Sequence, residues 1–231
     1  AFRNTVYMAL LNLTLGFIIP VILGLLISQV RNKRTSRVVQ TTTYMPYFVA
    51  PVVVCTLAKE FLKEGGAITM FLTMFGLPNQ NWLAVNSPVF WFINCFLGIW
   101  QGAGYGAIVY IAAINGIDQN LYEAACIDGA SRWQRLWNIT IPSVVPLVVM
   151  MFTMQIGLVF MTGFDKVLLL YMPTTYEFSD CLSTYTYRMA FSAGNDFSLS
   201  TASGLLQSII GTLLLIFGNK MSEKATKMSL F

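Results

Sequence analysis

The chain has 231 residues, of which 56% are apolar and only 10% are charged, with a formal net charge of +4 and a mean hydropathy of +0.64. A soluble domain carries roughly 25% charged residues, so this composition cannot supply a water-facing surface. The apolar residues also fall in long runs rather than on one face of amphipathic helices, which excludes an ordinary soluble domain and predicts burial in lipid.

Apolar stretches long enough to cross a bilayer recur along the chain, because about 20 mainly apolar residues span the hydrocarbon core as a helix. In chain order they are 5–30, 42–62, 88–117, 141–162 and 199–218. We therefore predict an all-α fold, a polytopic transmembrane helix bundle of about five spans, with residues 1–231 as a single domain. The chain begins at Ala1 rather than Met, so we also expect an upstream segment to precede this sequence.

The lysines and arginines predict the orientation, because they favour the cytoplasmic side of short loops. Nine of the fourteen lie in alternate connections, namely the 31–41 loop, the 115–140 loop and the tail with Lys220, Lys224 and Lys227. We therefore expect both loops and the C-terminus in the cytoplasm. The basic cluster of the first loop fits a topology signal that contacts lipid head groups, and no aromatic-rich basic stripe indicates nucleic acid.

The two connections on the opposite side differ in character. The 65–87 connection predicts a short interfacial helix followed by a turn. The 165–198 connection is rich in acidic residues, tyrosine, serine and threonine. It is either a surface for an external partner or an ordinary solvated loop.

The connection between the third and fourth stretches predicts two short helices separated by a glycine. Asn120 is positioned to cap the first helix, with Glu123 three residues on to complete the pair. Gly129 sits where a helix ends in the left-handed conformation. Ser131 and Gln134 repeat the capping pattern for a second helix.

This segment, residues 118–140, leaves two interpretations open on physical grounds alone. It is either a ledge that docks into a groove on another protein or an amphipathic connection lying on the membrane. Pro142 is then expected to open the fourth span, where a missing N–H is tolerated.

The residues here resemble a known signature. The segment contains Glu123-Ala124-Ala125, then three residues, Gly129, nine residues, Ile139, one residue and Ile141-Pro142. This pattern resembles the cytoplasmic E-A-A motif of permease subunits in binding-protein-dependent ABC importers. Ile141 stands where leucine is usual. The surrounding residues are similar to the carbohydrate, maltose-importer-type branch, as shown by the segments 117–122, 128–137, Tyr44-Met-Pro-Tyr and Trp100-Gln-Gly-Ala-Gly-Tyr.

The resemblance implies a mechanism and a set of partners. Two such permeases pair in a prokaryotic plasma membrane, a dimeric cytoplasmic ABC ATPase supplies the ATP chemistry, and an extracellular solute-binding protein delivers the cargo. The family usually has six or more spans, which again favours an upstream segment. By the match of motif positions, the coupling residues are Glu123, Ala124, Ala125, Asp128 and Gly129.

The stretches themselves carry almost no ionisable groups. A charge at mid-bilayer costs roughly 2.5–3.5 kcal/mol, and Lys59, Glu60, Asp165 and Lys166 are expected near span ends, where they reach water. This argues against an ion-coupled secondary carrier. Neutral amides and aromatic rings suit a hydroxyl-rich cargo, although in any one case they also serve as helix contacts. Our candidates for the substrate path are Tyr47, Asn94, Gln101, Tyr105 and Gln155.

The residue inventory leaves little for other chemistry. The chain has no histidine, its four cysteines include no C-x-x-C pair, and no G-x-x-x-x-G-K-[ST] loop is present. We therefore expect no metal site, no bound cofactor and no ATPase site, so that ATP is handled by a partner. The alternatives left open are an ABC permease for a solute such as phosphate or peptide and, with less support, a membrane enzyme or scaffold.

Overall fold

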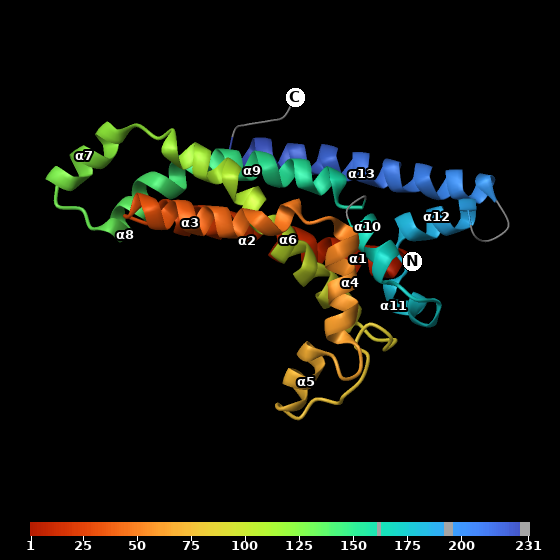
Figure 1. Cartoon of the computed structure of the whole chain (residues 1–231). Coiled ribbons are helices and arrows are strands. Elements are labelled where there is room, and N and C mark those ends of the chain that lie inside the picture. Colours follow the sequence, from red (N-terminus) through yellow and green to blue (C-terminus); the bar gives the residue numbers. More distant parts are fainter. Residues whose placement is uncertain (161–162, 192–195, 227–231) are drawn as a thin grey trace.

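The structure is a computed structural model that describes residues 1–160, 163–191 and 196–226, and every regular element in these ranges is a helix. Figure 1 shows α9 and α13 running side by side along the molecule, with α7 and α8 at one end and α10 to α12 at the other. Four helices in the described ranges are long and apolar enough to cross a membrane, or five if one bent pair counts as a span. The predicted all-α membrane bundle is confirmed.

The first span is one continuous helix with a π-helical turn. It comprises α1 (Phe2–Leu11), η1 (Asn12–Gly16) and α2 (Phe17–Ser28). The π turn ends at the residue four positions before Pro20. A proline ring clashes with the carbonyl at that position in a regular α-helix, and the wider turn accommodates it.

A π-helical turn before a proline also occurs in the fourth span, where the structure differs from the prediction. The run α8 (Arg132–Arg135), η3 (Leu136–Thr140) and α9 (Ile141–Leu158) is continuous, so the second short helix expected after Gly129 is the start of this span. Pro142 does not open the helix. It follows a π turn inside it, which accommodates the ring. Residues 161–162, the end of the expected fourth stretch, lie outside the described residues, as does Lys227.

The second stretch, expected to be one span over 42–62, is not a continuous helix. It is broken into α3 (Lys33–Tyr44), the 3-10 turn η2 (Met45–Phe48) and α4 (Pro51–Leu62). The first arm is Lys33–Phe48, and the second arm continues from α4 through α5 (Ala67–Thr73). The second arm is bent by 92° relative to the first. A proline disfavours helical backbone in the residue before it, and Ala50, which precedes Pro51, is accordingly extended at ψ 138°. Figure 1 shows α4 and α5 projecting from the side of the bundle.

The central helix α6 (Val89–Asn115) matches the expected third span and packs against α2, α3, α9 and α1. Glycine permits the closest of these approaches. An added Cβ on Gly104 would lie 2.0 Å from the Thr43 carbonyl oxygen of α3, and one on Gly24 of α2 would lie 2.9 Å from the Tyr110 Cβ. These contacts are the close packing of small residues that membrane helices use.

The long connection after the fourth span is helical rather than a simple loop. It contains α10 (Phe164–Leu170), η4 (Pro173–Thr175), α11 (Tyr176–Ser179) and α12 (Leu182–Phe191), and α13 (Phe197–Thr226) follows. The Trp91 indole donates to the Phe178 carbonyl at 2.6 Å, and the Asn4 amide donates to the Asp180 carbonyl at 2.8 Å. Burial raises the pKa of the Asp180 carboxyl, while its Thr184 and Arg188 partners act in the opposite direction.

Candidate functional site

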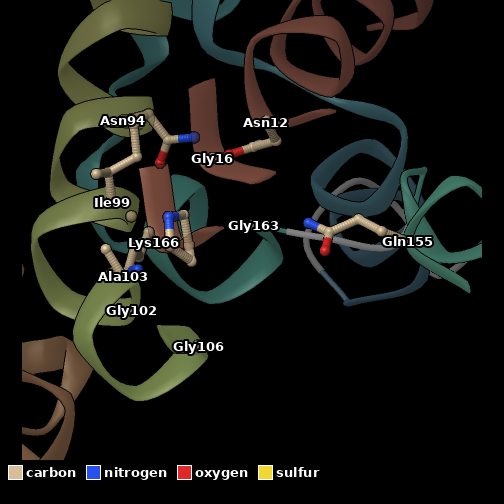
Figure 2. Close-up of a pocket in the computed structure, with 12 residues that line it drawn as sticks. Asn12, Gly16, Asn94, Ile99, Gly102, Ala103, Gly106, Gln155, Gly163 and Lys166 are labelled. Carbon is tan, nitrogen blue, oxygen red and sulfur yellow. The ribbon is translucent and has the colours of Figure 1, made fainter. Parts of the chain in front are cut away.

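A small polar cavity of about 310 Å³ lies inside the bundle, between α6, the first span and α10. Its polar lining comprises Asn12, Asn94, Gln155 and Lys166, and much of the remainder is glycine. Figure 2 shows Asn12, Asn94 and Lys166 close to one another beside α6, whereas Gln155 reaches toward the space from the opposite side. Because glycine contributes no side chain, the wall of α6 is open at Gly102, where an added Cβ would meet nothing within 4 Å.

A second cavity of about 660 Å³ adjoins the first, and the two share Gly102, Gly163 and Lys166 in their linings. Tyr47 and Gln101 line this larger cavity. The two cavities therefore form one polar region along α6 that opens toward the bend in the second span.

Gln101 also has a structural role that its sequence position does not disclose. Its amide nitrogen donates to the Val49 carbonyl oxygen at 2.7 Å. Val49 lies between η2 and α4, where the helix is interrupted and its carbonyl lacks a helical partner. Gln101 thus satisfies the broken backbone of the neighbouring helix.

The five candidate path residues separate into three groups. Asn94 and Gln155 line the smaller cavity, and Tyr47 and Gln101 line the larger one. Tyr105 lines neither, but its ring stacks on Tyr47 with centroids 3.9 Å apart and planes within 5°. The structure brings four of these side chains to one region, whereas their contact with a cargo stays a prediction.

Asn94 is the most deeply buried of these side chains, with only 4% of its surface exposed. Its amide nitrogen contacts the Met8 sulfur at 3.6 Å, and its oxygen Oδ1 has no hydrogen-bond partner. A buried acceptor without a partner costs free energy, and the side chain that carries this one lines the smaller cavity.

Lys166 was expected near a span end, and the structure corrects this expectation. Its ammonium nitrogen lies 3.9 Å from the Cβ position of Gly98, the tenth residue of α6. At 1.5 Å per residue, that point is about 14 Å along the 27-residue helix from Val89, inside the helix rather than at its end. Sequence spacing placed the lysine just after the fourth span. It could not show that α10 returns into the bundle.

Segment 118–140 forms the far end of the molecule, with α7 (Gln119–Ile127) as its first helix (Figure 1). The helix is capped by Asp118, whose carboxylate accepts from the Asn120 N–H at 3.0 Å, so the expected Asn120 cap is wrong. Asp118 has the non-helical backbone that a cap requires, whereas Asn120 is already inside the helix.

The turn after α7 has the predicted conformation. Gly129 is left-handed at φ +76°, and Ser131 and Gln134 form the expected capping box at the start of α8. The Tyr122 hydroxyl and the Thr140 hydroxyl are 2.8 Å apart, which joins α7 to the π turn of the fourth span. Local hydrogen bonds therefore hold the two helices at a defined angle.

The surface of this segment is largely open. Glu123, Ala124 and Asp128 are exposed, and Ala125 is half-buried. Large apolar side chains are uncovered as well, with Ile127 exposed to 87% and Trp133 to 70%. Exposed apolar surface rimmed by charges is typical of a protein–protein contact.

The cysteines do not form a further site. Cys55, Cys95 and Cys181 are buried, whereas Cys126 is exposed on α7. In the described ranges no three histidine, cysteine, aspartate or glutamate side chains group as a metal site.

Comparisons with known proteins agree with this architecture. The family model described as "Binding-protein-dependent transport system inner membrane component" matches residues 16–227. The polygalacturonan/rhamnogalacturonan transport system permease protein YteP of Bacillus subtilis (strain 168) is 35% identical over 223 residues, covering 96% of this chain and 69% of the relative. The sn-glycerol-3-phosphate transport system permease protein UgpA of Yersinia enterocolitica is 30% identical, covering 94% of this chain and 70% of the relative.

A solved structure is similar over the whole chain. A bacterial alginate ABC transporter, crystallised in complex with an alginate pentasaccharide-bound periplasmic protein, contains a chain that superposes with a TM-score of 0.92 at 36% identity. The match covers 100% of this chain and 80% of that one.

Proposed function

Since the chain belongs to the family of binding-protein-dependent transport system inner membrane components, we propose that it is a permease subunit of an ATP-driven importer for an oligosaccharide. The observation that carries the proposal is the polar, glycine-walled cavity beside α6, in a chain that superposes on an alginate transporter subunit with a TM-score of 0.92. Amides and aromatic rings recognise sugars through hydrogen bonds and stacking.

The path is proposed to run along α6, with Asn94 and Gln155 in the smaller cavity and Tyr47 and Gln101 in the larger one. Tyr105 supports Tyr47 from behind by stacking on its ring. A second permease subunit completes the path, and an extracellular solute-binding protein delivers the cargo to it.

Coupling to ATP is proposed to pass through segment 118–140. Its coupling residues are Glu123, Ala124, Ala125, Asp128 and Gly129, which present α7 and its turn to a groove in a cytoplasmic ABC ATPase dimer. The exposed side chains of Ile127 and Trp133 support a protein contact rather than a helix lying free in water. This assignment puts the loops 31–41 and 115–140 and the C-terminus in the cytoplasm. The chain itself is proposed to have no ATPase site and no cofactor.

Uptake by the assembled importer tests the proposal. The chain is reconstituted with its partner permease, ATPase and solute-binding protein in proteoliposomes, and uptake of labelled trigalacturonate, maltotriose, sn-glycerol-3-phosphate and a tripeptide is measured with and without ATP. We expect ATP-dependent uptake of an oligosaccharide and none of the tripeptide. Uptake confined to the tripeptide or to the phosphate ester contradicts the oligosaccharide proposal.

A phosphate ester is the second candidate cargo. It is favoured by the 30% identity to a relative named for sn-glycerol-3-phosphate and by the single lysine in the cavity. The same uptake experiment separates it from an oligosaccharide, because each labelled compound is tested alone.

A further inference from the structure

The cavity beside α6 contains a positive charge, that of Lys166, which forms no ion pair with any residue that the structure describes. The ion pairs in the described ranges are Lys63 with Glu60 and Arg188 with Asp180, and neither involves Lys166. Yet Lys166 lines both cavities, and its ammonium nitrogen lies over the glycine surface of α6, beside Gly98. A cation held there without a partner in the fold indicates a functional charge.

Two titratable groups act electrostatically on this charge, but neither forms an ion pair with it in the described ranges. They are Cys55, a buried thiol, and Asp165, the neighbour of Lys166 in the sequence. Asp165 is exposed and lines only the larger cavity, and no ion pair within 4 Å joins it to Lys166. The smaller cavity therefore has a cationic lining without a carboxylate.

A second, independent feature of the same cavity points to a ligand. Only 4% of the Asn94 surface is exposed, and its oxygen Oδ1 accepts no hydrogen bond from the described residues. Figure 2 shows the Asn94 side chain and Lys166 on the same side of the space. The lining of the cavity thus holds an ammonium donor and an amide acceptor that has no donor among the described residues.

Resting on the oligosaccharide function proposed above, we propose that Lys166 selects an acidic saccharide by binding a sugar carboxylate, while Asn94 Oδ1 accepts a hydrogen bond from a neighbouring hydroxyl. A neutral sugar would leave the ammonium group without a partner in the membrane interior, whereas a uronate supplies one. Charge-assisted hydrogen bonds of this kind are roughly twice as strong as neutral ones. The cargo class is therefore an oligosaccharide of uronic acids.

The test compares one sugar skeleton with and without its charges. Trigalacturonate and its trimethyl ester are supplied separately to proteoliposomes with the complete importer, and the ratio of their ATP-dependent uptake rates is measured. Each variant is compared with the wild type using the same solute-binding protein, so that any discrimination by that protein cancels. We expect Lys166→Gln to lower the acid-to-ester ratio by about tenfold or more, and Lys166→Arg to keep it within about threefold.

Two further variants serve as controls. Lys63→Gln removes an exposed lysine that is already paired with Glu60, so the ratio is expected to stay at the wild-type value. Asn94→Leu removes the acceptor and is expected to slow uptake of acid and ester alike, without changing their ratio. Co-purification with the partner subunits and basal ATPase activity confirm that each variant assembles.

The outcomes are distinct. An unchanged ratio in Lys166→Gln overturns the assignment, and so does failure of both Lys166→Gln and Lys166→Arg to assemble, because Lys166 is then structural. If the wild type imports maltotriose and not trigalacturonate, the acidic selectivity is wrong while the oligosaccharide function stands. If no oligosaccharide is imported at all, the proposed function itself fails.

Discussion

The 118–140 segment and the cavity beside α6 are built by opposite means. In the segment, the helix caps depend on residues a few positions apart, such as Asp118 with the Asn120 N–H or Ser131 with Gln134. In the cavity, the lining comes from helices far apart in the sequence, and Asn12, Asn94 and Lys166 meet only after the bundle has folded.

The 118–140 segment and the cavity also differ in the kind of side chain that each leaves without a partner. The segment leaves apolar side chains such as Ile127 open on the outside, whereas the cavity places polar groups such as Asn94 on the inside. A membrane bundle gains little from hiding apolar groups from lipid, so its interior is free to hold polar groups when these have a use. A segment in water that keeps apolar groups exposed is, by contrast, suited to a partner.

The largest expected effect is at the turn of the segment. Gly129→Val places a β-branched residue at φ +76°, a conformation that only glycine adopts without strain, and the angle between α7 and α8 changes. We expect uptake and cargo-stimulated ATPase activity to fall at least about tenfold while membrane insertion persists. The matched control is Gly204→Val on α13, where an added Cβ meets nothing within 4 Å. Normal coupling in Gly129→Val would show that the segment is only a connection.

An intermediate effect is expected from two glycines of α6 that lie two residues apart. Gly104→Ala forces a methyl group against the Thr43 carbonyl, whereas Gly102→Ala points into the cavity with nothing within 4 Å. Overpacking typically costs about 1–3 kcal/mol, so we expect the thermal midpoint of the purified complex to fall for Gly104→Ala alone. Gly102→Ala is expected to reduce uptake without loss of stability. Equal destabilisation by both would mean that the cavity wall is ordinary packing.

The smallest expected effect concerns the bend in the second span. Gln101→Ala removes the hydrogen bond to the Val49 carbonyl, which is worth about 0.5–1.5 kcal/mol net. We expect the free energy of unfolding to fall by about this amount and the apparent affinity for cargo to fall by several-fold to about tenfold. Gln155→Ala, in the smaller cavity, is expected to lower affinity alone. Thermal unfolding and concentration-dependent uptake of the two variants separate these roles. If Gln101→Ala changes neither, the bend does not depend on this contact.

The local features were predictable because local rules decide them. Gly129 and the capping box at Ser131 follow from residue type and spacing, and the helix lengths follow from bilayer thickness. The error at Asn120 arose because two neighbouring residues can both cap and only the backbone of Asp118 is non-helical. The break in the second span has a local signal in Pro51, because a proline disfavours helical backbone in the residue before it.

The cavity was less predictable for a physical reason. Asn94 and Gln101 were identified because amides in a span are costly unless they face the interior. Lys166 follows the fourth span directly in sequence, and only the return of α10 into the bundle places it beside Gly98. No periodicity in the chain discloses that return.

The broken second span also has a consequence for how the protein is made. The arm α4 has 12 residues and is about 18 Å long, well short of the roughly 30 Å core. Its bend leaves the Val49 carbonyl without a helical partner, which is unfavourable in lipid. The group that satisfies it, Gln101, is synthesised 52 residues later. The hydrogen bond that satisfies this bend can therefore form only after α6 has been synthesised.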